Sequence, residues 1–380
     1  MSDAGGGDAL DVLVVEPYHG GSHRAWAEGL VRHSRHRVRL VTHEDSFWRW
    51  RMRGGAVTLA DAVRRDVTGN GVPDVLLVSG MVDLASLLGL VRRDIGDVPV
   101  VLYLHENQLT HPLGPGQRPD EGIAWRTWTS LVAADAVWLN SAFQRDGLCA
   151  ALPGLLARAP DRPHHHHLAD VTERMAVVPV GVEVADVPHR APERHAAGPL
   201  VLWNHRWDHD KAPRVVLDAL RGLADEGVAF RVALVGENNR VDPREFSDAR
   251  VALGERVVRF GHVPSREDYV ELLARSDVVV SAARQEFFGI SVVEAAAAGA
   301  VPVVPDRLSY PEVLGSRWAP SCCYPAGGLL ERLRSVCTRL DAWRGAIDGL
   351  AADLRRRHAW EVIGPRYDRG FEDVVARGGR

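Results

Sequence analysis

The sequence lacks the features that mark several large classes of protein. No apolar run among its 380 residues approaches the ~20 residues that a membrane helix needs, so we expect no membrane partner. Residues 1–9, MSDAGGGDA, contain neither a basic segment nor an apolar one, and we therefore expect no signal peptide. The four cysteines form no CxxC pair and no spacing typical of zinc ligands. Free thiols and a cytoplasmic location are the simplest interpretation.

Lysine is almost absent from the chain. Of 46 basic residues, 45 are arginine, and Lys211 is the only lysine. This bias is typical of a GC-rich coding sequence. A lysine retained against it is expected where a compact ammonium works and a planar guanidinium does not, although chance is the alternative explanation.

Three familiar phosphate or acyl-transfer motifs are also missing. The chain contains no GxxxxGK[ST] loop, no GxGxxG after a strand and no G-x-S-x-G elbow. Nucleotide hydrolysis on a P-loop, binding of a dinucleotide by the usual glycine fingerprint and serine-hydrolase chemistry are therefore not predicted.

What is present is a regular alternation of short apolar runs and amphipathic stretches. This alternation is typical of parallel β-sheets covered by helices, and 380 residues with 46% hydrophobic and 25% charged residues fit a globular protein of two or three domains. We predict strands at 10–15, 36–41, 73–78, 98–104, 135–139, 174–180, 199–204, 230–236, 256–261, 277–282 and 300–305. Helices are predicted near 22–33, 58–66, 82–94, 121–134, 141–152, 212–226, 265–275, 290–298 and 327–357.

The fold class is therefore α/β, with two Rossmann-like, doubly wound parallel sheets in tandem. We place an N-terminal domain at 1–185, a C-terminal domain at 198–350 and a helical segment at 351–380 that could pack back on the N-terminal domain. The boundary lies near 181–198, which is rich in proline and lacks apolar periodicity. A second irregular stretch, 157–170, contains the four histidines His164–His167; a solvated loop is favoured over a metal site there, because no carboxylate or cysteine framework accompanies them.

The first candidate site follows the first predicted strand, in EPYHGGSHRAW. Gly20 and Gly21 stand at a strand-to-helix turn, where backbone N–H groups can approach a phosphate or a sugar. A plain tight turn is the alternative interpretation.

The second candidate site is the loop WNHRWDHDKAP after the first strand of the C-terminal domain. It places Arg206 and Lys211 just before a helix that begins near Pro213. Ligands bind at the carboxyl ends of parallel strands, and two cations there suit a diphosphate. Asp208 and Asp210 have the D-x-D form that binds a metal in one class of sugar transferase, but a three-residue pattern arises often by chance, and we predict no metal.

The third candidate site is RQEFFGISVVEAAAAGAVPVV, at 284–304. Glu286 ends a strand-to-helix turn, Gly289 permits a tight backbone, and the helix that follows directs its first N–H groups at an anion. Glu294 lies one turn into this helix, where its carboxylate can accept the two hydroxyls of a ribose. Acids that merely complement a helix dipole are the alternative.

An arginine-rich stretch offers a candidate surface for nucleic acid. Residues 24–65 contain ten arginines against four acids, and FWRWRMR at 47–53 alternates arginine with aromatic residues. Aromatic rings that stack on bases, between arginines that bind phosphates, are what recognition of single-stranded RNA requires. The candidates are Arg49, Trp50, Arg51 and Arg53; an amphipathic surface segment with its apolar face buried is the alternative.

These motifs together resemble a known group of enzymes. ExFGxxxxEA after an R…K loop, on tandem Rossmann sheets, resembles the GT-B fold of family 4-type retaining glycosyltransferases. EPYHGGSHRAWAEGL (16–30), FWRWRMRGGA (47–56), LYLHENQLTHP (102–112) and EFFGISVVEA (286–295) resemble the motifs of the tRNA-queuosine α-mannosyltransferases. The resemblance covers most of the chain, but not the histidine-rich loop, and 316–380 matches only in outline.

The resemblance implies two domains that face each other across a cleft, and it implies roles for individual residues. Arg206 and Lys211 would hold the diphosphate of a nucleotide-sugar, Glu294 the ribose, and Glu286 the transferred sugar or the phosphate. His105 would lie near the sugar and act in catalysis with Arg206, Lys211 and Glu286. The full set of donor-binding candidates adds Gly20, Gly21, Phe288, Gly289 and Ile290, and the acceptor side adds His23 and Asn107 to Arg49, Trp50, Arg51 and Arg53.

We therefore expect a metal-independent, retaining transferase without a cofactor, which moves mannose from GDP-mannose to the cyclopentene diol of queuosine in the anticodon loop of a tRNA, with tRNA-Asp as the expected substrate. The alternatives are the same fold acting on a lipid, glycan or small metabolite, a nucleotide-sugar epimerase, and a non-catalytic RNA-binding protein. The residues alone set neither the nucleotide base nor the oligomeric state.

Overall fold

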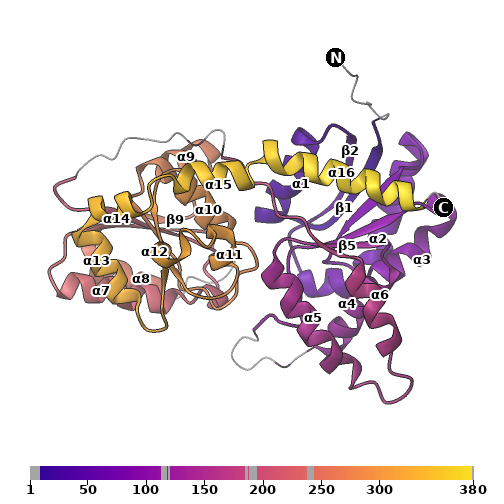
Figure 1. Ribbon diagram of the computed structural model, residues 1–380, viewed down its shortest axis with the longest axis horizontal. Coiled ribbons are helices and arrows are strands. Elements are labelled where there is room, and N and C mark those ends of the chain that lie inside the picture. The colour runs from indigo at the N-terminus through magenta and orange to yellow at the C-terminus, as the bar shows by residue number, and fades with distance from the viewer. Residues whose placement is uncertain are drawn as a thin grey trace. The chain divides into compact units, whose positions relative to one another are not determined.

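The computed structural model describes residues 9–112, 118, 120–184, 187, 195–237 and 244–378, apart from the side chain of Glu245. These residues form two compact units (Figure 1). The first unit runs to Gly181 and takes up the chain again at Trp360, and the second spans Val182–Ala359 together with Pro112. None of the helices in these ranges combines the length and the apolar character needed to cross a membrane.

The first unit is built on a parallel sheet in the order β2-β1-β3-β4-β5-β6. The reversal of strand order between β1 and β3 makes the unit doubly wound, because crossovers on either side of it leave helices on opposite faces. Its strands are β1 (Asp11–His19), β2 (Arg37–Glu44), β3 (Val75–Ser79), β4 (Val100–Leu104), β5 (Ala136–Leu139) and β6 (Met175–Val177). Its helices are α1 (Gly21–His33), α2 (Trp48–Asn70), α3 (Leu84–Ile95), α4 (Glu121–Ala133), α5 (Ala142–Leu156), η1 (His165–His167), α6 (Leu168–Glu173) and α16 (Trp360–Gly378).

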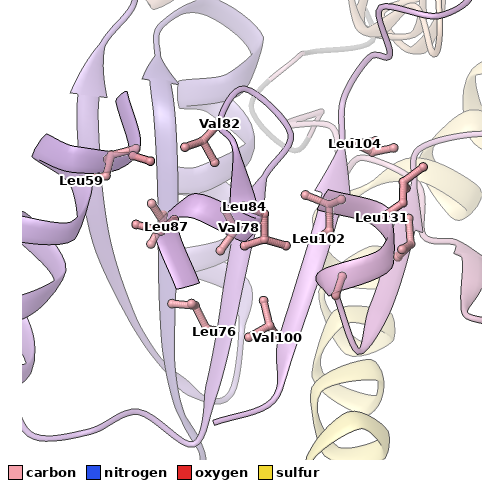
Figure 2. Packing of buried hydrophobic residues seen from close by; sticks show 14 of the residues in the cluster. Leu59, Leu76, Val78, Val82, Leu84, Leu87, Val100, Leu102, Leu104 and Leu131 are labelled. Atoms are coloured by element: carbon pink, nitrogen blue, oxygen red, sulfur yellow. The ribbon is translucent and has the colours of Figure 1, made fainter. Parts of the chain in front are cut away.

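Apolar runs that are buried along their whole length form the core of this unit. All five residues of β3 and of β4 are buried, as expected for strands covered on both faces. Figure 2 shows alternate residues of these strands, Leu76 and Val78 of β3 and Leu102 of β4, packed against Leu87 of α3 and Leu131 of α4. Because the core fixes the strands, their carboxyl ends place the loops that follow β1, β2 and β4 along one edge of the sheet.

The second unit contains another parallel sheet, in the order β12-β11-β10-β7-β8-β9, with its reversal between β7 and β10. The strands are β7 (Leu200–Asn204), β8 (Arg231–Val235), β9 (Val257–Gly261), β10 (Val278–Val280), β11 (Val301–Pro305) and β12 (Cys323–Tyr324). The helices are η2 (His209–Lys211), α7 (Pro213–Asp225), α8 (Arg244–Leu253), η3 (Gly254–Arg256), α9 (Arg266–Arg275), α10 (Ile290–Ala297), α11 (Tyr310–Leu314), α12 (Ala319–Cys322), α13 (Leu329–Thr338), α14 (Leu340–Ala346) and α15 (Leu350–His358).

The predicted helical segment 351–380 is divided between the two units. α15 belongs to the second unit, where the Arg355 guanidinium donates to the Ala297 carbonyl at the end of α10. α16 belongs to the first unit and lies along α1 (Figure 1). Its Trp360 ring lies directly against Gly29 and Gly181, where any Cβ would collide with it. The division therefore falls at residue 359 rather than at 350.

The histidine-rich stretch is more ordered than a solvated loop. His165–His167 form η1, which leads directly into α6. The Trp128 indole N–H donates to Nδ1 of His164 at 2.9 Å, and the two rings stack with centroids 6.4 Å apart. His164–His166 are exposed, as expected for a solvated segment, but from His165 onward the stretch is helical rather than a loop.

Candidate active site

The strongest cluster of charged residues in the second unit lies at the carboxyl ends of β7 and β10. These are the two strands that flank the reversal of strand order, which is where doubly wound folds bind their ligands. The loop after β7 leads through η2 to Lys211, and the loop after β10 leads to Glu286 and then to α10. Sheet topology therefore brings together two motifs that are about 75 residues apart in the sequence.

Lys211 is the centre of this cluster. Its Nζ donates to the Gln285 carbonyl at 2.9 Å and lies 3.1 Å from Oε2 of Glu286 and 3.2 Å from Oδ2 of Asp210. Its side chain is only 11% exposed. An ammonium buried this far is stable only because two carboxylates and a carbonyl replace its water.

The directions of the pKa shifts favour an ionised pair of Lys211 and Glu286. Burial raises the pKa of Glu286, but Lys211 and then His205 lower it by more than burial raises it. The pKa of Glu286 therefore lies below its usual value. Burial lowers the pKa of Lys211, yet Glu286 and Asp210 raise it above the usual value. The charge of Arg206 also lowers the pKa of Lys211, which indicates that the two predicted diphosphate cations lie near each other.

A pH dependence of stability follows from Glu286. A carboxyl whose pKa is lower in the folded protein than its ordinary 4.5 stabilises the fold above that pH, and the contribution is lost as the pH falls through the folded pKa. We expect Glu286→Gln to lower the melting temperature most near neutral pH. The difference from the parent should shrink below about pH 4.5. Thermal melts of both proteins from pH 3 to 8 test this, and a difference that does not change with pH would contradict an ionised Glu286.

The helix α10 begins as the sequence predicts. Gly289 has a φ of 93° and caps the helix in the left-handed region, which suits glycine, and Ile290 is the first helical residue. A Cβ at position 289 would meet the Tyr310 ring at 3.1 Å. The Phe288 ring is buried and lies edge-on to His358 with centroids 5.3 Å apart, so its side chain belongs to the core.

Glu294 has partners that the sequence did not indicate. Nη1 of Arg266 lies 2.7 Å from Oε1 of Glu294, and the Tyr269 hydroxyl donates to Oε2 at 3.1 Å. The Asn204 amide donates both to the Tyr269 hydroxyl and to the Ser291 carbonyl, and so joins β7, α9 and α10. Burial raises the pKa of Glu294, and Arg266 offsets part of that rise. Arg266 and Tyr269 thus fix the position of the Glu294 carboxylate on α10.

His205 is a further site residue that the sequence analysis missed. Its Nδ1 lies 3.3 Å from the Ser291 hydroxyl, whereas its Nε2 is buried without a hydrogen-bond partner. Burial and the neighbouring Lys211 lower its pKa to about 4, so the ring is neutral at physiological pH. It stands beside Arg206 in the sequence, but nothing in the motif distinguishes it from an ordinary loop histidine.

In the first unit, His105 lies at the end of β4 among buried polar and aromatic groups. Its ring centroid is 4.1 Å from that of His23 and 4.5 Å from that of Trp26. Its Nε2 lies 3.9 Å from Oε2 of Glu16, too far for a hydrogen bond, and has no hydrogen-bond partner in the part of the chain that the structure describes. Nδ1 of His23 lies 3.2 Å from that same oxygen of Glu16. Burial, and then His23, keep the pKa of His105 well below its usual value, so its ring is neutral near pH 7.

Gly20, Gly21 and Asn107, three further predicted site residues of this unit, follow β1 and β4 at the carboxyl edge of the sheet. Gly20 caps α1, and the Asp45 side chain lies directly against it, while Gly21 has a φ of 49°. The side-chain oxygen of Asn107 accepts from both the N–H and the hydroxyl of Thr110, and its Nδ2 is buried without a partner. The turn at Gly20 therefore has the Asp45 carboxylate beside it. Asn107 stabilises its own loop through its hydrogen bonds with Thr110.

Two groups of described residues could hold a metal ion. Glu16, His23 and His105 bring their ligand atoms within 4.8 Å of one another, and so do Asp208, His209 and Asp210. Asp208 already caps η2 through the His209 N–H at 2.9 Å, and Asp210 pairs with Lys211. The D-x-D pattern therefore has a structural explanation that needs no metal.

Comparisons with known proteins agree with this picture. Residues 11–182 match the family model described as the N-terminal part of tRNA-queuosine α-mannosyltransferase, and residues 189–319 match group 1 glycosyltransferases. The chain is 32% identical over 311 residues to the tRNA-queuosine α-mannosyltransferase of Drosophila melanogaster, which covers 80% of this chain and 81% of that protein. The chain belongs to the tRNA-queuosine α-mannosyltransferase family. The resemblance predicted from the motifs is confirmed, and the protein is a glycosyltransferase.

More distant relatives define the fold. A GDP-mannose:cellobiosyl-diphosphopolyprenol α-mannosyltransferase of Xanthomonas campestris is 27% identical over 137 residues, which is 35% of each chain. Starch synthase IV of Arabidopsis thaliana superposes with a TM-score of 0.70 at 11% identity, covering 97% of this chain and all of that one. Anabaena HepE does so with a TM-score of 0.67 at 14% identity, covering 96% and 99%. The predicted GT-B fold with two parallel α/β sheets is confirmed.

Proposed function

We propose that the protein transfers mannose from GDP-mannose to a hydroxyl of the cyclopentene diol of queuosine, in the anticodon loop of a cytoplasmic tRNA, with tRNA-Asp as the expected substrate. Family membership supports the reaction class, and the ionised Lys211–Glu286 pair at the start of α10 supports the position of the donor. The observation that carries the proposal is that this buried ammonium contacts Gln285 and Glu286, in the turn that leads into α10.

The chemistry follows from charge. Glycosyl transfer passes through an oxocarbenium-like transition state, and the leaving diphosphate gains negative charge as the bond to the sugar breaks. Lys211, Arg206 and the first N–H groups of α10 would stabilise that charge in place of a metal ion. We expect retention of configuration by attack on the face from which the diphosphate departs, as the family resemblance implies.

The test of this proposal is a transfer assay on defined RNA. The protein is incubated with queuosine-containing tRNA and separately with GDP-mannose and other nucleotide-sugars, and the digested nucleosides are weighed. We expect a hexose to be added to queuosine with GDP-mannose only. The matched control is the same tRNA with guanosine in place of queuosine, which should stay unmodified. Transfer to a lipid, glycan or free metabolite while queuosine-containing tRNA stays unchanged would overturn the proposal.

Metal independence is a separate prediction. Because cationic side chains and a helix dipole would neutralise the leaving group, we expect the transfer rate to stay within about twofold after treatment with EDTA. Asp208→Asn should leave the response to EDTA unchanged. Loss of transfer on chelation, with recovery on addition of manganese or magnesium, would instead assign metal ligands to one of the two clusters described above.

A further inference from the structure

A row of exposed apolar side chains runs along one face of α2. Trp50 and Val57 are 62% and 57% exposed, and with Gly54 between them they follow one another at intervals of four and three residues, which places them in one stripe on the helix. Phe47, the residue that precedes α2, is 78% exposed and lies at the start of this stripe in the sequence. The opposite side of the same helix faces the protein, because Met52 is buried and Trp48 packs beside it against Met81 and Ile123. The stripe is therefore not part of the core.

Gly54 supports the ring of Trp50. A Cβ at position 54 would lie 2.8 Å from two atoms of the indole ring and 3.2 Å from a third. The six-membered part of the indole ring thus packs against Gly54, where a side chain larger than a hydrogen atom would collide with it. A large ring held in this way while 62% of the residue remains exposed is a preformed surface.

Phe47 adds an independent observation. It has a φ of 52° and a ψ of 46°, a left-handed conformation that is unfavourable for an aromatic residue. Its ring is exposed, so burial offers no compensation for this conformation. Strained residues of this kind concentrate at sites of binding. The strained phenylalanine and the seated tryptophan lie one helical turn apart.

The surroundings of the stripe suit a polyanion. The Arg49 guanidinium lies over the Trp48 ring, 5.0 Å from its centroid, and Arg51 donates to the Glu44 carbonyl. Neither arginine has an acidic partner among the described residues, whereas Arg53 is paired with Asp120. Two uncompensated cations beside exposed rings favour RNA over an apolar protein surface.

The stripe also lies at the edge of the sheet that carries the other polar residues of this unit. α2 begins four residues after β2 ends, and the carboxyl end of β2 adjoins that of β1. Asp45, between the two elements, touches Gly20 in the loop after β1. Phe47 and Trp50 are therefore continuous with the loop that leads to His23.

We propose that Phe47 and Trp50 form a stacking platform for an unpaired base of the RNA acceptor, with Arg49 and Arg51 binding the adjacent phosphates. The inference rests on the proposed function, since it names the surface that would hold the tRNA beside the modified nucleotide. Trp48 lies in the same FWRWRMR segment but has no part in this platform, because it packs against Met52, Met81 and Ile123.

Binding of queuosine-containing tRNA to Trp50→Ala tests the proposal. Loss of one stacked ring should raise the dissociation constant by about 5- to 150-fold, because base–aromatic stacking contributes that much per base. Trp50→Phe should recover most of the affinity. Val251→Ala, which removes an 83% exposed apolar side chain from α8 in the other unit, is the matched control and should bind as the parent does. The melting temperature and the affinity for GDP should stay at the parent values in all three variants.

Phe47→Gly should affect stability and tRNA binding differently. Glycine accepts the left-handed conformation without strain, so the variant should melt no lower than the parent while it binds tRNA more weakly.

Equal tRNA affinity in Trp50→Ala, Phe47→Gly and the parent would overturn the platform, even if the parent transfers mannose to queuosine. Absence of transfer by the parent would overturn the proposed function, and the binding comparison would still decide the platform. A stripe that joins two copies of the chain would appear as dissociation of an oligomer by Trp50→Ala without any change in tRNA affinity, and this too would overturn the proposal.

Discussion

Replacing Lys211 with alanine is expected to lower the rate of sugar transfer about 100- to 1000-fold. The ammonium would stabilise charge that appears on the leaving diphosphate, and removal of one such donor typically has an effect of that size. The loss should fall on kcat more than on KM, because the charge is greatest in the transition state. Single-turnover transfer to queuosine-containing tRNA at saturating donor measures it.

The burial of Lys211 makes a control necessary. Its removal leaves the carboxylates of Asp210 and Glu286 without their cation, and breaking a buried pair in this way typically costs about 3–5 kcal/mol of folding stability. Arg206→Ala is the matched variant, because Arg206 is exposed and its loss should slow transfer without lowering the melting temperature comparably. If both variants remain folded and turn over near the parent rate, the diphosphate binds elsewhere.

Most of the strands could be predicted because each is a short apolar run buried along its length. β3, β4, β7 and β11 are buried at every position and stand out from the polar segments around them. β12 was missed because two residues, Cys323 and Tyr324, give no periodicity. The first ten residues of α2 were missed as helix because Gly54 and Gly55 interrupt the pattern of helix-forming residues, although Met52, Ala56 and Leu59 carry the helical period.

The candidate site was predictable where one loop supplies it and not where several elements meet. Arg206 with Lys211, and Glu286 with Glu294, each belong to a single strand-to-helix connection, so spacing was enough to find them. Whether these residues perform the predicted roles stays a prediction. The ion pair between Lys211 and Glu286 depends on the adjacency of β7 and β10, which the chain order alone does not give.

The residues that contact the predicted site from other helices and strands could not be identified from the motifs. Arg266 and Tyr269 come from α9 and reach Glu294 only because α9 and α10 are neighbours in the fold. Glu16 follows the apolar run Val12–Val15 of β1, and its contact with His23 requires α1 to fold back along β1. In FWRWRMR, by contrast, the helical period of α2 is enough to separate the half-buried Trp48 from the exposed Trp50.

Glu294→Gln is expected to weaken binding of the nucleoside diphosphate about 10- to 100-fold. A hydrogen bond to a charged group contributes about 1.5–3 kcal/mol, and glutamine keeps the shape of the side chain while it removes the charge. Within the described residues, Oε1 of Glu294 accepts from Arg266 and Oε2 accepts from Tyr269, and each oxygen can accept a second donor such as a ribose hydroxyl. Because burial raises the pKa of Glu294, the affinity of the parent should also fall as the pH is lowered toward that value.

A thermodynamic cycle with a modified ligand identifies the contact. The dissociation constants of GDP and of 2′,3′-dideoxy-GDP are measured by calorimetry for the parent and for Glu294→Gln. If the carboxylate accepts the ribose hydroxyls, the substitution should weaken binding of GDP but leave that of the dideoxy nucleotide almost unchanged, because the interacting group is already absent. Arg266→Ala serves as the control for loss of the neighbouring ion pair and should not distinguish the two ligands. An equal loss of affinity for both nucleotides in Glu294→Gln would show that Glu294 organises α9 and α10 rather than binding the ribose.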